Sequence, residues 1–233
     1  MAYVIPAPAV PAVAVAGCDD LFPVNRVYCV GRNYADHARE MGHDPDREPP
    51  FFFAKAPDNL LAASENDGGG AFSYPAQSED VHHEIELVVA LDQGGANITE
   101  ANALNCIWGY GVGIDMTRRD LQGQAKKMGR PWDVGKAFDQ AAPIGRLHAA
   151  SETGHLNAGR VWLDINGDIR QDGDLNQLIW NIPETISYLS GLFTLQPGDL
   201  IYTGTPAGVG PVAKGDVLTG GVDGLSGIKI TVV

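Results

Sequence analysis

Two glutamates open an apolar run in the segment His82-His83-Glu84-Ile85-Glu86-Leu87-Val88-Val89-Ala90-Leu91. Because the five residues after the second glutamate are all apolar, we expect a buried strand there. Side chains alternate between the faces of a strand, so Glu84 and Glu86 are expected on one face and the isoleucine between them on the other. Two carboxylates that lose solvation side by side repel each other unless a cation neutralises them. The pair therefore indicates a cation site at the mouth of a buried strand.

A third carboxylate, Asp115, follows a second apolar segment, Ile107-Trp108-Gly109-Tyr110-Gly111-Val112-Gly113-Ile114. If the two strands end side by side, Asp115 joins Glu84 and Glu86 and leaves room for water or substrate. Three carboxylates are hard oxygen ligands that suit Mg²⁺ or Mn²⁺, whereas Zn²⁺ favours nitrogen and sulfur. The alternative is that the two glutamates lie on the solvated face of a half-buried sheet. The pair alone does not decide between the two.

The composition fits one sizeable domain. Of the 233 residues 44% are hydrophobic and 19% are charged, which is enough for a substantial core and unlike a disordered chain. We expect residues 1–20 to form an extended N-terminal arm, because three prolines interrupt the apolar start and no basic region precedes it, as one would in a signal peptide. Residues 21–233 are expected to form a single domain.

The charge and the cysteines narrow the partners and the compartment. The formal net charge is −13, which argues against nucleic-acid binding because phosphate contacts need clustered Lys and Arg. The sequence has no apolar run of about 18 residues, so no membrane span is predicted. The three cysteines, Cys18, Cys29 and Cys106, show no ligand-like spacing. They are interpreted as reduced thiols of a cytoplasmic protein.

The predicted elements indicate an α+β fold with many strands and few short helices. Helices do not alternate regularly with strands, so a doubly wound parallel sheet is not expected. Besides the two segments above, strands are expected over residues 24–30, 51–55, 199–202, 216–218 and 227–233.

Turn and cap residues predict three further local features. Asn166-Gly167 between apolar flanks predicts a two-residue hairpin within 161–169. The polar, glycine-containing segment 65–70 is expected to form a surface hairpin. Asp174 is expected to cap a helix over 175–182, and Pro183 either starts a new helix or kinks this one.

A histidine and a glutamate in Gly31-Arg32-Asn33-Tyr34-Ala35-Asp36-His37-Ala38-Arg39-Glu40 have the spacing of a general base. His37 and Glu40 are three residues apart, so on a helix over 34–41 they share a face and can hydrogen-bond. A carboxylate that orients a histidine fixes its tautomer and stabilises the imidazolium. The alternative is an exposed helix face with ordinary charge pairing, which is the simpler interpretation when this segment is taken alone.

The segment that begins at Asp115 carries groups that suit an anion. Asp115 is expected where a strand gives way to a helix, whose first-turn N–H groups favour an ionised carboxylate and bound anions. Arg119 and Gln122 are three residues apart and can point together at a substrate. The alternative, a surface basic run with Lys126 and Lys127, fits Arg118 better than Arg119.

Two later segments add candidate groups. Lys136 lies among glycine, aromatic and apolar residues in 132–139, where a partly buried ammonium can polarise a carbonyl or hold a carboxylate. The segment 202–211 is a strand followed by a loop of Gly, Thr and Pro that offers backbone N–H and hydroxyl donors to an anion. It lacks the Gly-Lys-Ser/Thr ending of a Walker loop.

Together and in this order, these clusters resemble the fumarylacetoacetate hydrolase family, from about Tyr28 to the C-terminus. No single segment is specific, but five lie in register: Val30-Gly31-Arg32-Asn33-Tyr34, His82-His83-Glu84-Ile85-Glu86, Gly113-Ile114-Asp115-Met116-Thr117, Lys136-Ala137-Phe138-Asp139 and Thr203-Gly204-Thr205-Pro206.

The resemblance implies a mixed β-roll or β-sandwich, usually dimeric, with Mg²⁺ or Mn²⁺ as cofactor. The implied metal ligands are Glu84, Glu86 and Asp115. The implied catalytic groups are a water-activating dyad of His37 and Glu40, and Lys136, which assists at the substrate oxygen. The implied substrate contacts are Arg32, Tyr34, Arg119, Gln122 and Thr205.

The implied reaction is metal-dependent hydrolysis of the C–C bond of an acylpyruvate, which is a 2,4-dioxo acid. The short chain and the segment 44–53 are most similar to family members that cleave fumarylpyruvate to fumarate and pyruvate. The alternative is decarboxylation or keto–enol interconversion of oxaloacetate, because these reactions pass through a similar enolate. A non-catalytic metal-stabilised binding protein would be expected to lack the dyad or the lysine, and this chain keeps His37, Glu40 and Lys136.

Overall fold

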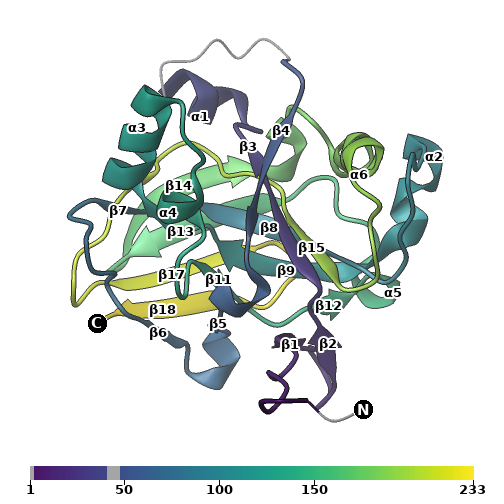
Figure 1. The fold of residues 1–233 in the computed structure, drawn as a ribbon, viewed down its shortest axis with the longest axis horizontal. Helices are drawn as coiled ribbons and strands as arrows, with labels where there is room; N and C mark the ends of the chain where they lie inside the picture. The colour runs from purple at the N-terminus through teal and green to yellow at the C-terminus, as the bar shows by residue number, and fades with distance from the viewer. Residues whose placement is uncertain (1–2, 41–47) are drawn as a thin grey trace.

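The protein contains two large β-sheets over a shared core (Figure 1). Its structure, a computed structural model, describes residues 3–40 and 48–233. Residues 41–47, which include part of the segment 44–53, lie outside the described residues, as do the side chains of residues 37–39.

The larger sheet is mixed and carries two of the strands next to the predicted carboxylates. Its spatial order is β4 (Phe51–Lys55), β3 (Arg26–Gly31), β15 (Asp199–Tyr202), β8 (Ile85–Leu91), β9 (Ile107–Ile114), β11 (Ala142–Ile144) and β5 (Leu60–Ala62), and β12 (His148–Ala149) pairs with β9. The pairs β3–β15 and β5–β11 are parallel, and the other pairs are antiparallel. Strands β8 and β9 pair along most of their length. The two apolar segments of the sequence are therefore neighbouring strands.

A second sheet and two small ones complete the fold. The second sheet has the order β14 (Asp168–Asp174), β13 (Arg160–Ile165), β17 (Val217–Val222), β18 (Ile228–Val232) and β6 (Gly70–Phe72). The small sheets consist of β10 (Thr117–Arg118), β7 (Val81–His83) and β16 (Gly210–Pro211), and of β1 (Ala12–Ala14) and β2 (Leu21–Pro23). The predicted α+β class with mixed sheets and few short helices is confirmed.

Strand β8 is buried along its whole length because its two faces pack into different cores. Ile85 and Leu87 face the core that the two large sheets share. Val88 and Ala90 face a second core on the other side of the larger sheet. Since neither face meets water, the strand is an uninterrupted apolar run rather than an alternating one. Glu86 lies on the face of Val88 and Ala90, as the alternation predicts.

The helices are short, and one group of them lies beside the predicted site. Helices α1 (Ala35–Glu40), α3 (Arg119–Met128) and α4 (Asp133–Lys136) lie together at the upper left of Figure 1, and α4 packs against α3, β4 and β10. The remaining helices are α2 (Glu100–Ala103), α5 (Ala150–Thr153), α6 (Ile182–Leu192) and the 3₁₀ turns η1 (Pro57–Asn59), η2 (Glu65–Asp67), η3 (Leu104–Cys106) and η4 (Leu175–Gln177).

The hairpin predicted at Asn166-Gly167 is confirmed, whereas the surface hairpin predicted over 65–70 is wrong. Asn166 and Gly167 connect β13 and β14 with φ of 55° and 90°, the left-handed conformation that a tight two-residue turn requires. The segment 65–70 instead forms η2 and enters β6. Strand β5 pairs with β11 while β6 pairs with β18, so this segment carries the chain from one sheet to the other.

The helix predicted over 175–182 is also wrong. Asp174 caps the 3₁₀ turn η4 by accepting a hydrogen bond from the Asn176 N–H at 2.9 Å, but the turn ends after three residues. The Ile179 N–H then donates to the Asn33 carbonyl at 2.8 Å, which holds the chain extended. Asn181 caps the new helix α6, with Pro183 in its first turn. Pro183 therefore starts a helix, which is one of the two predicted alternatives.

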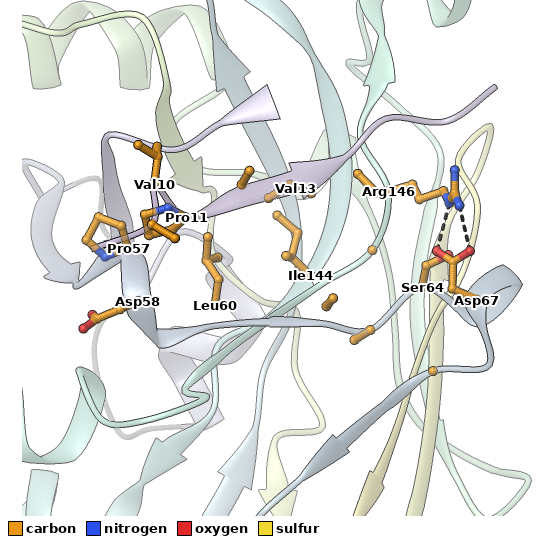
Figure 2. Close-up of a pocket in the computed structure, with 17 residues that line it drawn as sticks. Val10, Pro11, Val13, Pro57, Asp58, Leu60, Ser64, Asp67, Ile144 and Arg146 are labelled. Atoms are coloured by element: carbon orange, nitrogen blue, oxygen red, sulfur yellow. Dashed lines mark hydrogen bonds and ion pairs between the residues drawn. The ribbon is translucent and has the colours of Figure 1, made fainter. Parts of the chain in front are cut away.

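The N-terminal arm packs on the larger sheet beside an apolar groove (Figure 2). Val13 is buried in the second core. Leu60 and Ile144 line the groove, and at one end of it Arg146 pairs with Asp67 at 2.7 Å. The wall is otherwise mainly apolar, with Asp58 as the further charged residue that lines it.

Two observations bear on the environment of the protein. In the part of the chain that the structure describes, no helix is long and apolar enough to cross a membrane. The cysteines are unpaired: Cys18 is exposed, and Cys29 and Cys106 are buried.

Candidate metal centre and active site

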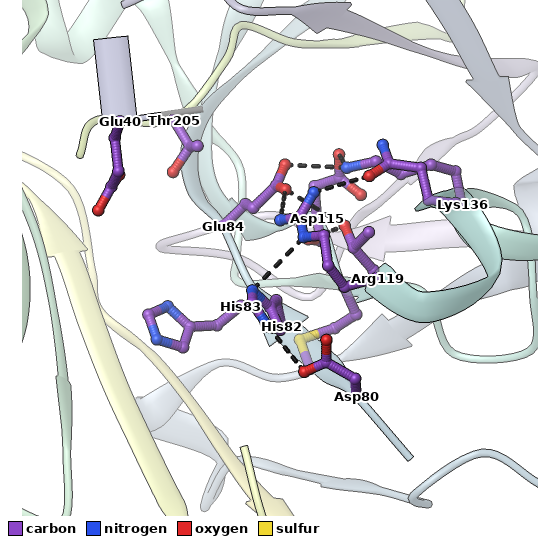
Figure 3. A network of polar contacts seen from close by, with 12 residues as sticks. Glu40, Asp80, His82, His83, Glu84, Asp115, Arg119, Lys136 and Thr205 are labelled. Atoms are coloured by element: carbon purple, nitrogen blue, oxygen red, sulfur yellow. Dashed lines mark hydrogen bonds and ion pairs between the residues drawn. The ribbon is translucent and has the colours of Figure 1, made fainter. Parts of the chain in front are cut away.

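Three buried carboxylates meet where β7 gives way to β8 and where β9 ends. Figure 3 shows two of them, Glu84 and Asp115, side by side. The Asp115 N–H donates to the Glu84 carbonyl oxygen at 2.8 Å, so the two strand ends are held side by side. One carboxylate oxygen from each of Glu84, Glu86 and Asp115 lies within 4.8 Å of the others. The structure thus brings together the three residues that the sequence predicts as metal ligands.

Three cations neutralise these carboxylates. Lys136, at the end of α4, places its Nζ 2.9 Å from Glu84 Oε2 and 2.6 Å from Asp115 Oδ2. Lys55, the last residue of β4, places its Nζ 2.8 Å from Asp115 Oδ1. The Arg119 guanidinium pairs with Glu84 Oε1. Burial alone would lower the pKa of Lys136, but the neighbouring Asp115 and Glu84 carboxylates raise it overall, so this lysine is a buried ammonium.

The surroundings of Asp115 differ from the prediction that a helix begins directly after it. Strand β10 intervenes, and α3 begins at Arg119, whose N–H donates to the Asp80 carbonyl. The helix N-terminus therefore does not stabilise Asp115, and Lys55 and Lys136 do so instead. Asp115 Oδ1 accepts no hydrogen bond within the described ranges, because Lys55 meets it only as an ion pair.

Glu86 is the least compensated of the three carboxylates. Its Oε2 accepts a hydrogen bond from the Gly204 N–H at 2.7 Å. A side chain at Gly204 would approach the Asn33 Cβ to 2.7 Å, and the φ of 102° also favours glycine. Burial, with added repulsion from Asp115 and Glu84, holds the pKa of Glu86 well above its usual range. A cation bound between the three carboxylates would remove this repulsion.

The donor set fits Mg²⁺ or Mn²⁺. Its three ligand groups offer only hard oxygen atoms, which these ions prefer. The three carboxylates are already balanced by Lys55, Lys136 and Arg119. A divalent cation would therefore give the site a net positive charge, which favours an anionic substrate. This agrees with the predicted cofactor.

Arg119 and Gln122 point to the same place from the first turn of α3, as their spacing predicts. Arg119 Nη1 donates to Gln122 Oε1 at 2.8 Å, while Nη2 pairs with Glu84. Gln122 is buried, and its carboxamide oxygen is held by Arg119. The amino group of Gln122 therefore remains as a donor for another partner.

A buried glutamine that the sequence did not reveal organises the opposite wall. Gln171 Oε1 accepts from the Ile85 N–H at 3.0 Å and lies 2.9 Å from His83 Nδ1. Its Nε2 donates to Thr205 Oγ1 at 2.8 Å and to the Pro206 carbonyl at 2.9 Å. Because the carboxamide oxygen can only accept, His83 carries its proton on Nδ1. Burial lowers the pKa of His83 to about 4, so the ring is neutral.

The same network sets the direction of the Thr205 hydroxyl. Since Thr205 Oγ1 accepts from Gln171, its own proton is free to be donated elsewhere. Thr205 also lines a small hollow over the carboxylates. Gln171 therefore holds a predicted substrate contact in a donating orientation, although it lies on β14, far from the other site residues in sequence.

The hollow brings most of the predicted substrate contacts together. Arg32, Arg119, Gln122 and Thr205 line it, with Lys136 on its floor. Aromatic rings form part of its wall: the Trp132 ring centroid lies 5.4 Å from that of Phe51 and 5.9 Å from that of Phe53. Tyr34 is placed elsewhere, because its side chain is buried in the core that the large sheets share.

The predicted dyad is only partly described. His37 lies on α1, but its side chain is outside the described residues, so its contact with Glu40 is not tested. The Gly208 N–H lies 3.1 Å and 3.3 Å from the two carboxylate oxygens of Glu40. This contact holds Glu40 next to the loop that carries Thr205 (Figure 3).

Comparison with known proteins agrees with this geometry. The family model described as fumarylacetoacetate (FAA) hydrolase C-terminal matches residues 26–233. The crystal structure of fumarylpyruvate hydrolase from Pseudomonas aeruginosa in complex with Mn²⁺ and pyruvate is 50% identical and has a TM-score of 0.96, and the match covers 100% of this chain and 99% of that one.

Two curated relatives have different names. A mitochondrial oxaloacetate decarboxylase of Dictyostelium discoideum is 40% identical over 86% of this chain and 89% of its own length. A mitochondrial oxaloacetate tautomerase of Mus musculus is 40% identical over 88% of this chain and 90% of its own length. Each match spans most of this chain and most of the relative, and the chain belongs to the fumarylacetoacetate hydrolase family.

Proposed function

We propose that this enzyme hydrolyses the C–C bond of an acylpyruvate, with fumarylpyruvate as the preferred substrate and fumarate and pyruvate as products. One observation carries the proposal. The whole chain superposes on a fumarylpyruvate hydrolase that binds Mn²⁺ and pyruvate, and the three buried carboxylates of this chain form a site for such an ion.

The cationic groups of the site suit the pyruvate end of the substrate. With a divalent cation held by Glu84, Glu86 and Asp115, positive charge exceeds negative charge around the hollow. Arg119 and the amino group of Gln122 would then bind the carboxylate of the pyruvate moiety. The bound metal would supply Lewis-acid stabilisation of negative charge on the substrate oxygen.

The protein groups supply the proton transfers. His37, oriented by Glu40, is proposed to take a proton from water as the hydroxyl oxygen bonds to the carbonyl carbon of the acyl group. The bond between that carbon and the methylene group then breaks, and its electron pair leaves with the pyruvate fragment as an enolate. The enolate takes up this proton at carbon from the His37 imidazolium, which gives pyruvate and restores the neutral base. The Lys136 ammonium, fixed by Glu84 and Asp115, stabilises the enolate charge as it develops.

The test is a substrate panel with Mn²⁺-loaded and Mg²⁺-loaded enzyme. Fumarylpyruvate, acetylpyruvate and oxaloacetate are each supplied at equal concentration, and pyruvate release is followed by coupling to lactate dehydrogenase. We expect kcat/KM for fumarylpyruvate to exceed that for oxaloacetate by at least about ten-fold, which corresponds to 1.4 kcal/mol of transition-state binding. Fumarate release in equal amount identifies hydrolysis.

The second candidate is decarboxylation or tautomerisation of oxaloacetate, which the names of the two curated relatives favour. It predicts the reverse ranking in the same panel. Carbon dioxide release identifies decarboxylation, and the loss of enol absorbance without pyruvate formation identifies tautomerisation. If oxaloacetate is the better substrate by either measure, the hydrolase proposal is wrong.

The assembly and the compartment remain predictions. The family resemblance favours a homodimer, and the three unpaired cysteines favour a reducing compartment such as the cytoplasm. Light scattering of the purified enzyme and fractionation of the source cells test them.

A further inference from the structure

Two cations at the outer end of the hollow, Arg32 and Lys126, each lie against an aromatic ring. Lys126 Nζ lies 5.0 Å from the Trp132 ring centroid, and Arg32 Cζ lies 5.4 Å from that of Phe51. Neither cation forms an ion pair with a residue in the ranges 3–40 and 48–233. Both side chains line the hollow. We call this pair the outer end, and the three carboxylates with their lysines the inner end.

Helix α3 connects the two ends. Arg119, Gln122 and Lys126 occupy positions three and four residues apart, so they form one stripe along the helix. Arg119 contacts Glu84 at the inner end. Lys126 comes seven residues later, roughly 10 Å farther along the helix axis. The stripe therefore begins at the predicted metal ligands and ends at an ammonium that has no ion-pair partner among the described residues.

Aromatic rings fill the wall between these ends. Lys136 Nζ lies 4.9 Å from the Phe53 ring centroid at the inner end. Phe53 and Phe51 both contact Trp132, and the Lys126 ammonium lies over the Trp132 ring. A flat, conjugated chain that starts at Lys136 would pass along these rings and reach the outer cations.

The backbone at Arg32 is strained. Its φ is 57°, in the left-handed region that a residue with a Cβ rarely adopts. Such strain persists where the surrounding structure holds the residue in place, and it is enriched at binding and catalytic sites. Here the strained residue brings a guanidinium to the hollow.

The charges of the outer end also favour an anion. Burial, together with the nearby cations Arg119, Arg32 and Lys136, lowers the pKa of Lys126 to about 8. A bound carboxylate would relieve the repulsion among these cations. The protein as a whole is acidic, with a net charge of −13. The excess of positive charge at this hollow is therefore a local feature and not a property of the whole chain.

We infer that Lys126 and Arg32 bind the distal carboxylate of a dicarboxylic acylpyruvate and so select it over a monocarboxylic one. The inference rests on the proposed function and deepens it. In fumarylpyruvate the second carboxylate is separated from the cleaved carbonyl by a planar trans double bond. Lys126 thus acts as a specificity residue, outside the groups that break the bond.

The test compares a matched pair of non-cleavable ligands, so that it does not depend on turnover. 2-Oxoheptanedioate carries a distal carboxylate, and 2-oxoheptanoate lacks it; neither has the second carbonyl at which hydrolysis occurs. Binding to the Mn²⁺-loaded enzyme is measured by calorimetry for the native chain and for Lys126→Met. The control is Lys127→Met, because Lys127 is the exposed neighbour on the same helix.

We expect the native enzyme to bind the dicarboxylate at least about ten-fold more tightly, as a charge-assisted hydrogen bond allows. Lys126→Met should lose most of this preference while its affinity for 2-oxoheptanoate stays within two-fold, taken as roughly the error of such mutational comparisons. Lys127→Met should keep the preference, and Lys126→Arg should retain it.

Two results overturn the inference. One is a native enzyme that does not prefer the dicarboxylate, and the other is an equal loss of both ligands in Lys126→Met. Failure of the proposed function is a separate outcome, seen as no cleavage of any acylpyruvate in the substrate panel. An enzyme that cleaves acylpyruvates but shows no ligand preference would retain the function and lose the subsite.

Discussion

The two ends of the hollow differ in how their charges are matched. At the inner end, Lys136 touches both Glu84 and Asp115, and Lys55 touches Asp115. At the outer end, the cations lie against the rings of Phe51 and Trp132. The inner end is a buried network of opposite charges that can take one more cation. The outer end is a positive edge that can take an anion.

Burial explains the difference. A fully buried charge without a partner is strongly destabilising, so every cation of the inner end needs its carboxylate. A half-buried lysine keeps part of its ammonium in water and tolerates the lack of a partner. Substitutions at the inner end should therefore change folding and metal binding together. Substitutions at the outer end should change ligand choice and leave folding almost unaltered.

The largest effects are expected for two inner-end carboxylates, Asp115 and Glu86. Both Asp115→Asn and Glu86→Gln should lose metal binding and reduce kcat/KM by roughly a thousand-fold or more, because a metal contributes several kcal/mol to stabilising transition-state charge. The metal content is measured by elemental analysis after dialysis, and kcat/KM by pyruvate release.

The two variants should move the stability of the metal-free protein in opposite directions. Asp115→Asn leaves Lys55 and Lys136 without a shared partner and should lower the free energy of unfolding by about 3–5 kcal/mol. Glu86→Gln keeps an oxygen for the Gly204 N–H and removes a carboxylate whose pKa is raised by burial. It should raise that free energy by on the order of 1 kcal/mol. Urea unfolding in the presence of a chelator measures both, and equal destabilisation would contradict the contrast.

An intermediate effect is expected for Gln171, which lies in the wall rather than at either end. Gln171→Leu removes the acceptor for His83 and Ile85 and the donor to Thr205. Substitution of such a supporting group typically costs about 10–100-fold in activity. We expect kcat to fall by that amount while the metal content is unchanged.

The control for Gln171 is Arg170→Leu, one residue away on β14 and exposed. It should leave kcat and the metal content as they are in the native enzyme. A proportional loss of metal in Gln171→Leu would mean that Gln171 supports the carboxylates, and its assignment as a positioning residue for Thr205 would be wrong.

The sequence predicted the inner end better than the wall or the outer end, for a physical reason. Glu84, Glu86 and Asp115 lie at the ends of two strands, and the uninterrupted apolar runs of these strands predict that they are buried. The two strands pair with each other, which brings their ends together. Gln171 instead follows three exposed residues in β14, so nothing local indicates that it is buried. Its partner His83 is 88 residues away, and only the packing of the two sheets brings them into contact.

Local signals failed where tertiary contacts overrode them. The apolar spacing after Asp174 predicts a helix, but the contact of Ile179 with Asn33 holds the chain extended. The sequence predicts Lys55 only as the last residue of a strand. It does not predict the ion pair of Lys55 with Asp115, because Asp115 is distant in sequence and contacts Lys55 only in the folded sheet. Lys126 was interpreted as part of a surface basic run, since the sequence does not show the aromatic ring beneath it.

The smallest effect is expected at the outer end, in the pH dependence of substrate choice. Since the pKa of Lys126 is lowered to about 8, its ammonium is lost as the pH rises through that value. The ratio of kcat/KM for fumarylpyruvate to that for acetylpyruvate should therefore fall by up to about ten-fold between pH 7 and pH 9, because kcat/KM reports the free enzyme. The charged groups that act on Lys126 are Arg119, Arg32, Lys136 and Glu84.

Lys126→Arg provides the control for this titration. A guanidinium stays charged throughout the range, so this variant should keep its preference for fumarylpyruvate to pH 9. Acetylpyruvate has no distal carboxylate. Titration of groups that act on both substrates, including the general base, changes both kcat/KM values equally and therefore drops out of their ratio. If the native enzyme and Lys126→Arg show the same decline, the titrating group is not Lys126, and the positive edge does not select the substrate through this lysine.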